Sequence, residues 1–234
     1  GLNPRFTTIG QLRIWKVWPK KGRFMKIMNL YELALLLRAK LKMAKWPFNR
    51  YGFPVFPREV ILEEPPTLIE PIQRIRCCKK PNENLLSSFS DDLFIKRRLQ
   101  RIFEEINLYG LFKGFGGFDL SPRIRWPFQQ QKFNIWLSQL ATAFVALSGQ
   151  KIIPNFRIGN LQTLFALESY PKNIPYVVGT LGCSKRMLPL HEFIFKTKLL
   201  IARPSHLTIY GPLRTGYEKL MLEQGVEYNV VTDF

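Results

Sequence analysis

The feature that most constrains this chain is the alternation of strand-like and helix-like segments between residues 111 and 234. Short apolar segments typical of strands occur at Leu111–Leu120, Lys151–Phe156, Tyr176–Leu181, Leu207–Tyr210 and Glu227–Thr232. Helical patterns separate them at Gln131–Ser148, Leu161–Ser169, Leu190–Ala202 and Thr215–Gln224. Because strands joined through helices run in the same direction, these repeated strand–helix units predict an α/β fold with a parallel sheet.

The number of strands leaves the form of this sheet open. Parallel strands of this kind suit an open doubly wound sheet with helices on both faces. They also suit an incomplete or complete barrel, if elements from the first 110 residues supply further strands. In either form the carboxyl ends of the strands lie on one side, so the loops that follow them are expected to carry the functional residues.

A phosphate-binding site is predicted at these strand ends. The segment Gly179–Arg186 passes from a strand into a loop that contains glycine, a hydroxyl group and two cations. Backbone N–H groups and cations in such loops bind phosphate. The candidate phosphate-binding residues are Ser184, Lys185, Arg186, Arg157 and Arg214. The alternative is an ordinary loop with solvated cations, because neither the P-loop pattern nor the dinucleotide glycine pattern occurs there.

The stretch Gly-Phe-Gly-Gly-Phe-Asp at 114–119 places three glycines before an aspartate. The glycines precede or lie within a strand, so they are expected to allow close backbone packing or a bulge, not to cradle phosphate. Asp119 and Asp233 form a candidate catalytic carboxylate pair that holds Mg²⁺ for phosphodiester cleavage. The alternative for Asp119 is a cap of the following turn. With two histidines and no Cys-x-x-Cys pattern, zinc is not expected.

The charge of the chain points to an anionic partner. Its 234 residues include 35 Lys and Arg against 17 Asp and Glu, a net charge of +18. Residues 1–60 hold 13 of these cations and two acids, residues 61–110 hold eight of each, and residues 111–234 hold 14 and seven. Such a surface attracts polyanions, nucleic acid first and an anionic membrane surface second. No apolar run reaches the length of a membrane span. Nucleic acid is the predicted partner, and a membrane is not.

Residues 1–60 are interpreted as a basic, aromatic N-terminal region made of a hairpin and a helix. Strands are expected at Gln11–Trp18 and Arg23–Met28, and a helix follows Asn29, with Glu32 completing a capping box. Cations bind phosphates and rings stack on bases. The nucleic-acid-binding candidates are Arg13, Trp15, Lys16, Trp18, Lys20, Lys21, Arg23, Lys26, Arg38, Lys42 and Lys45. The alternatives are a core role for the tryptophans and a solvated helix face for the last three cations.

Residues 61–110 are interpreted as a proline-rich connector followed by a helix. Ser90 or Asp91 is the expected N-cap, and Gly110 the expected end. An odd cysteine count without regular spacing favours a reducing compartment, so a cytoplasmic location is expected. The adjacent Cys77 and Cys78 have no assigned role.

The segment 111–234 resembles a known family in several short motifs. These are Gly-Phe-Asp-Leu-Ser-Pro at 117–122, Asn134, Lys-Ile-Ile-Pro-Asn at 151–155, Val-Val-Gly-Thr-Leu-Gly-Cys at 177–183 and Ile-Tyr-Gly at 209–211. In them the chain resembles an uncharacterised family of phage, prophage and plasmid proteins, domain-of-unknown-function family 4417. The resemblance covers about half of the chain and implies a mobile-element setting, hence the cytoplasm of a bacterial host cell, or a virion. It implies no activity.

Three functions are compatible with these observations. The first is nucleic-acid binding, mainly through phosphate contacts, in phage or plasmid DNA metabolism such as replication. The second is a metal-dependent nuclease or other phosphodiester enzyme that uses the strand-end carboxylates with Mg²⁺. The third is a structural or assembly protein of a virion or ribonucleoprotein. A protein partner or a homo-oligomer is compatible with each of them, and the sequence does not choose between DNA and RNA.

Overall fold

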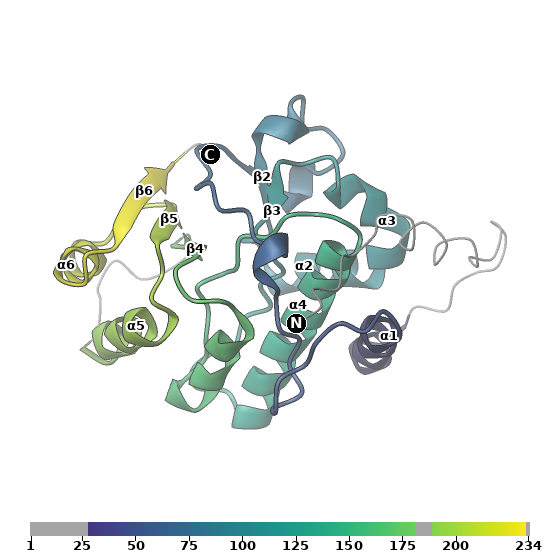
Figure 1. Ribbon diagram of the computed structural model, residues 1–234, viewed down its shortest axis with the longest axis horizontal. Coiled ribbons are helices and arrows are strands. Elements are labelled where there is room, and N and C mark those ends of the chain that lie inside the picture. Colours follow the sequence, from purple (N-terminus) through teal and green to yellow (C-terminus); the bar gives the residue numbers. More distant parts are fainter. Residues whose placement is uncertain (1–27, 181–188, 233–234) are drawn as a thin grey trace, which may run out of the picture.

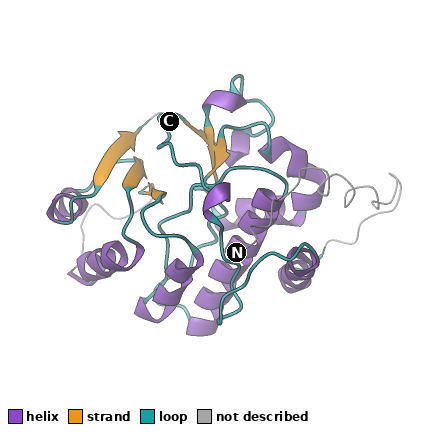
Figure 2. Cartoon of the chain, in the orientation of Figure 1, coloured by secondary structure: helices purple, strands orange, loops and turns teal. Residues whose placement is uncertain are grey.

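The computed structural model describes residues 28–180 and 189–232, and it shows a mixed α/β fold with central strands and surrounding helices (Figures 1 and 2). One three-stranded sheet contains β1 (Ile69–Pro71), β2 (Leu85–Ser87) and β3 (Gly114–Phe115). All of its strands are parallel, with Ile69 opposite Leu85 and Leu86 opposite Phe115. The α/β class with parallel strands, predicted from the sequence, is confirmed.

A second three-stranded sheet lies in the C-terminal part of the chain. Its strands are β4 (Pro175–Gly179), β5 (His206–Tyr210) and β6 (Glu227–Val231), again all parallel and in chain order. All five residues of β4 pair with β5, from Pro175 opposite His206 to Gly179 opposite Tyr210. These strands are close to the segments expected from their apolar, β-branched composition.

The segment 151–156 connects the two sheets. Ile152 forms parallel bridges with Phe115 of β3 and with Ile61, and Asn155 forms one with Val177 of β4. Pro154 lies between these bridges and has no N–H to donate, although its carbonyl accepts from Val177. The strand predicted here is therefore present only as short bridges, because its pairing changes from one sheet to the other within five residues.

The two sheets face a shared interior. One buried cluster takes a side chain from every strand except β3 and one from the 151–156 segment: Ile69, Leu85, Ile153, Val177, Tyr210 and Val231. The first and last strands also approach each other, since Asn229 of β6 donates to the carbonyl of Pro66, close to β1, at 3.0 Å. Parallel strands in chain order around a common interior match the incomplete-barrel alternative, because an open doubly wound sheet reverses its strand order.

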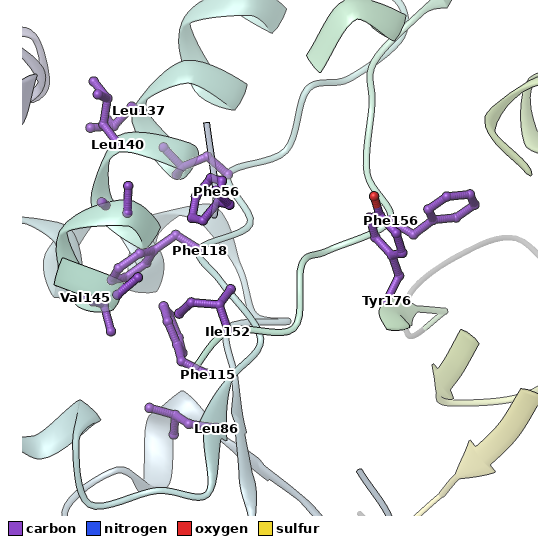
Figure 3. Packing of buried hydrophobic residues seen from close by; sticks show 14 of the residues in the cluster. Phe56, Leu86, Phe115, Phe118, Leu137, Leu140, Val145, Ile152, Phe156 and Tyr176 are labelled. Atoms are coloured by element: carbon purple, nitrogen blue, oxygen red, sulfur yellow. The ribbon is translucent and has the colours of Figure 1, made fainter. Parts of the chain in front are cut away.

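The helices cover the outside of the strands. They are α1 (Leu30–Met43), α2 (Asp92–Gln100), α3 (Ile102–Tyr109), α4 (Phe128–Leu147), α5 (Pro189–Ala202) and α6 (Thr215–Glu223), with a 3-10 helix, η5, at Leu161–Ser169. The main core lies between α4 and the strands, where Phe115, Phe118 and Ile152 pack towards Leu140 and Val145 (Figure 3). None of the described helices combines the length and the apolar character needed to cross a membrane.

The first described helix forms as its sequence predicts. Asn29 accepts a hydrogen bond from the backbone N–H of Glu32 at 2.8 Å, and the Glu32 side chain accepts one from the Asn29 N–H. Leu33, Ala34, Leu37 and Leu41 are buried on one face. The helix ends at Met43 with Ala44 as its C-cap, and Lys45 follows with a positive φ of 60°.

Several expected elements differ in extent. The proline-rich region was not expected to hold β1 and β2, whose three residues each are too short to show a periodic pattern. The helix expected before Gly110 is two helices, α2 and α3, with a break at Arg101, and Asp91 is its N-cap. The helix expected at Leu161–Ser169 is a 3-10 helix.

The strand expected at Leu111–Leu120 is reduced to Gly114–Phe115. Beyond it, the N–H of Phe118 donates to the Thr142 hydroxyl at 2.9 Å and that of Leu120 to the Ser138 hydroxyl at 3.1 Å. These backbone groups therefore bond to α4 instead of a neighbouring strand. The interpretation of the glycines is confirmed: a Cβ on Gly114 would lie 2.8 Å from Leu62 Cδ2, and Gly117 has a φ of +75°.

The three expected regions contact one another in the structure. β2 comes from the 61–110 region and pairs with β3 from the 111–234 region. α1, from the first region, packs on α4. The expected hairpin of residues 11–28 lies outside the described residues, apart from Met28.

Candidate functional site

Two of the strand-end residues expected to carry function, Arg157 and Arg214, line one pocket of about 340 Å³. Its walls are the loop after β3, the residues after the 151–156 segment, the inner face of α5 and the start of α6. We call it the strand-end pocket. It is lined by Pro122, Arg123, Ile124, Arg157, Ile158, His191, Ile194, Phe195, Lys198, Arg214 and Tyr217. Two predicted phosphate-binding residues, Arg157 and Arg214, are thus placed in the same pocket.

The pocket is strongly cationic. Arg123, Arg157, Lys198 and Arg214 line it, together with His191. Within the described part of the chain, its lining contains no Asp or Glu. Four cations that converge on one concavity favour an anionic ligand, because their mutual repulsion falls when an anion lies between them.

Arg214 has an unsatisfied donor at this pocket. Its Nη2 atom is buried and has no hydrogen-bond partner among the described residues. The guanidinium carbon lies 5.6 Å from the centre of the Tyr217 ring, which in turn stacks on Phe195 with ring centres 4.2 Å apart. A buried, unpaired N–H costs free energy, and an anion in the pocket would supply the missing acceptor.

Lys198 is the buried amine of the pocket, with a side chain that is 8% exposed. Its Nζ donates to the carbonyl oxygen of Phe156 and lies 4.2 Å from the centre of that residue's ring. Burial, with help from the charge of Arg157, lowers the Lys198 pKa to about 7, although Asp119 opposes the shift. The amine therefore gains or loses its proton near neutral pH, and a bound anion would favour the protonated form.

Asp119 does not line the strand-end pocket, but it pairs with Arg157, which does. Its carboxylate accepts from Arg157 Nη1 at 3.4 Å. Burial raises the pKa of Asp119, the charge of Arg157 opposes this, and that of Asp92 adds to it. Asp119 also lines a cavity of about 20 Å³. Its role in this geometry is to hold and partly neutralise Arg157.

A metal centre built on Asp119 stays a prediction. Across residues 28–180 and 189–232, no group of three or more His, Cys, Asp and Glu side chains is arranged to hold a metal ion. Asp233, the expected partner of Asp119, lies outside the described residues. Within the described residues the Asp119 carboxylate accepts its hydrogen bond from Arg157, so Asp119 does not cap the following turn.

The loop that carries Arg123 is held by a buried glutamine. Gln131, at the start of α4, donates to the carbonyl oxygens of Trp126 at 2.7 Å and Ile124 at 3.2 Å. Its own carbonyl accepts from the N–H of Asn160 at 2.7 Å. A Cβ on Gly159 would lie 1.9 Å from Gln131 Oε1, so glycine is required for this approach. One wall of the pocket is therefore fixed from inside the fold.

The remaining candidates fall into two groups. Lys42 and Lys45 are exposed at the end of α1, and Arg38 is half-buried on the same helix. The others lie outside the described residues: Arg13, Trp15, Lys16, Trp18, Lys20, Lys21, Arg23, Lys26, Ser184, Lys185 and Arg186. The strand-end pocket includes none of the three α1 cations.

Sequence reasoning missed Lys198, Arg123 and His191 as pocket residues. For Lys198 a signal was present, because it follows Ile194 by four residues on the apolar stripe of the helix that contains it. A lysine in a buried stripe must find compensation, which marks the position as unusual. Arg123 carried no comparable pattern, since an arginine after a proline in a loop is common.

Comparison with protein-family models, with curated protein sequences and with solved structures finds no match for this chain. The resemblance to the mobile-element family therefore stays a prediction from the short motifs in residues 117–211.

Proposed function

We propose that this protein binds nucleic acid and that the strand-end pocket takes a phosphate group of the ligand. The observation that carries the proposal is the convergence of Arg123, Arg157, Lys198 and Arg214 on one pocket whose described lining holds no carboxylate. The net charge of +18 supports it, because a polyanion is then attracted from a distance as well as bound at contact.

The pocket offers phosphate two kinds of donor. Arg214 presents a buried N–H without a described partner, and guanidinium groups match the oxygens of a phosphate in a forked geometry. Lys198 offers a point charge whose protonation the phosphate itself would favour. The stacked rings of Phe195 and Tyr217 form an apolar side next to these donors, suited to the sugar or base that adjoins the phosphate.

The setting of this activity is proposed from the sequence. The motif resemblance between residues 111 and 234 favours DNA metabolism of a phage or plasmid, such as replication, in the cytoplasm of a bacterial host. The basic residues before position 28 and the loop residues Ser184, Lys185 and Arg186 remain further candidates for phosphate contacts. Arg38, Lys42 and Lys45 belong to the same proposal.

Arg214→Gln tests the role of the pocket. The variant removes one charge and the buried donor, and a charge-assisted hydrogen bond contributes about 1.5–3 kcal/mol. We expect the affinity for a labelled single-stranded oligonucleotide at about 50 mM salt to fall at least about tenfold, measured by fluorescence anisotropy. Arg97→Gln is the matched control, because Arg97 is an exposed arginine of α2 that does not line the pocket.

Two results would contradict the proposal. Equal losses in the Arg214 and Arg97 variants would show that only total charge matters and that the pocket is not the site. An oligonucleotide affinity of the unmodified protein that is the same at about 50 mM and about 200 mM salt would remove the phosphate-contact basis altogether.

A further inference from the structure

A second pocket, of about 300 Å³, lies between α1, the turn at residues 50–53 and the first half of α4. We call it the aromatic pocket. Tyr51, Phe133 and Trp136 line it, and the fully buried Phe53 supplies a fourth ring. The Nε1–H of Trp136 donates to the carbonyl of Gly52 at 3.0 Å, which fixes the indole against the turn. The rings are thus held in place by segments far apart in the sequence.

The polar groups of the aromatic pocket are cationic or neutral. Arg38, Lys132 and Gln129 line it, and within the described ranges no Asp or Glu does. The Nε atom of Arg38 is buried and has no hydrogen-bond partner among the described residues. Lys132 lies with its ammonium 6.0 Å from the centre of the Phe165 ring, and Gln129 is exposed.

These groups match one kind of ligand. Flat rings offer stacking surfaces for a planar heterocycle, the unpaired Arg38 N–H needs an acceptor, and the Gln129 amide both donates and accepts. The charge of Lys132 suits a phosphate attached to that heterocycle. The volume of the pocket is at the lower end of the range for small-molecule sites, which fits a single nucleotide unit.

We propose that the aromatic pocket takes one unstacked base of a single-stranded nucleic acid, with Lys132 near its phosphate. A base within a duplex is stacked and paired, so it cannot enter a pocket between two helices. This inference rests on the proposed function, because it takes nucleic acid as the ligand. It adds a preference for single strands.

The chain between the two pockets supports one continuous ligand. Arg123 and Ile124 line the strand-end pocket, and Lys132, eight residues further on, lines the aromatic pocket. Between them, Arg125 is exposed, and the Arg123 guanidinium lies 5.2 Å from the Trp126 ring centre. Cations and a ring thus continue along the segment that separates the pockets, as expected for the path of a phosphodiester backbone.

The test compares two single-stranded ligands of about 12 nucleotides that carry the same number of phosphates: oligothymidylate and an abasic chain of equal length. Stacking contributes about 1–3 kcal/mol per base, so the unmodified protein should bind oligothymidylate at least about fivefold more tightly at about 50 mM salt. Phe133→Leu removes a flat ring and keeps an apolar side chain, and it should reduce this preference. Phe193→Leu, at an exposed phenylalanine of α5 outside both pockets, should leave it unchanged.

A second variant tests the aromatic pocket independently, in case Phe133→Leu does not fold. Arg38→Gln keeps every ring of the pocket and removes the buried donor, so it should lower the preference for oligothymidylate as well. Equal affinity of the unmodified protein for both ligands would overturn this inference and leave the proposed function intact. Failure of both ligands to bind would overturn the proposed function too. A preference that persists in both the Phe133 and Arg38 variants would place base contacts elsewhere and reject the aromatic pocket.

Discussion

The buried amine of Lys198 makes a quantitative prediction about how stability depends on pH. In the folded chain the amine lies over Phe156 and against its carbonyl oxygen, and burial lowers its pKa from 10.5 to about 7. In the unfolded chain the amine returns to water and keeps the ordinary lysine pKa. Between about pH 7 and about pH 10 the unfolded chain therefore binds more protons at this position than the folded chain does.

The sign of the effect follows from this difference. Stability rises with pH wherever the unfolded state binds more protons, so Lys198 makes the folded chain more stable as the pH rises through this window. One pKa unit corresponds to about 1.4 kcal/mol, so the shift from 10.5 to about 7 amounts to about 4–5 kcal/mol over the whole window. Below about pH 7 the amine is charged in both states, and its contribution no longer changes.

Lys198→Met isolates this contribution, because methionine has a similar length and does not titrate. We expect the variant to be more stable than the unmodified protein at about pH 7, and this advantage to shrink by several kcal/mol by about pH 10. The measurement is urea denaturation of both proteins at several pH values. Lys196→Met, at an exposed lysine of the same helix, controls for the loss of one charge. A difference that stays constant within about 1 kcal/mol from pH 7 to 10 would refute the desolvation of this amine.

Two further predictions follow from buried charges. Glu105 is fully buried and accepts from Arg98 at 2.8 Å and Arg76 at 2.9 Å, so Glu105→Gln should lower the free energy of unfolding by about 3 kcal/mol in urea denaturation. Glu104 is half-exposed, so the control variant Glu104→Gln should change the free energy of unfolding by no more than about 0.5 kcal/mol. Equal losses in the two variants would contradict the burial argument. Oligonucleotide affinity should fall as the pH rises from about 6 to about 8, because the Lys198 amine loses its proton near pH 7. Lys198→Met should weaken or remove this dependence, and parallel pH profiles of the two proteins would show that another group causes it.

The outcome for the C-terminal half shows how far sequence patterns reach. β5 and β6 were predicted almost to the residue, because short apolar, β-branched runs such as His206–Tyr210 lie between clear helices. The capping box of Asn29 and Glu32 located α1 in the same way. The sequence was sufficient to predict these elements, because residues close together in the chain decide their conformation.

The central strands show why other elements could not be predicted. β1 and β2 are three residues long, and they form because each has a partner strand from elsewhere in the chain. The expected strand at Leu111–Leu120 ends at Phe115, since the following N–H groups find hydroxyls on α4. These choices depend on contacts between residues far apart in the sequence, which no local pattern contains.

The candidate site likewise has residues that the sequence could predict and contacts that it could not. The rule that functional residues follow parallel strands predicted that Arg157 and Arg214 lie on the same side of the fold, and the structure puts both in the strand-end pocket. It could not show that Asp119 pairs with Arg157, nor that Lys198 reaches the pocket from a helix.

The sequence by itself determined the α/β class, the positive charge and the position of most C-terminal elements, because composition and short-range periodicity decide them. Only the tertiary structure decided that the two sheets share one interior and that four cations meet in one pocket. The physical reason is that the burial of a side chain and the distances between charges depend on how the chain is folded in three dimensions. Arg123, Arg157, Lys198 and Arg214 are scattered over 92 positions of the chain, and only folding brings their charges together.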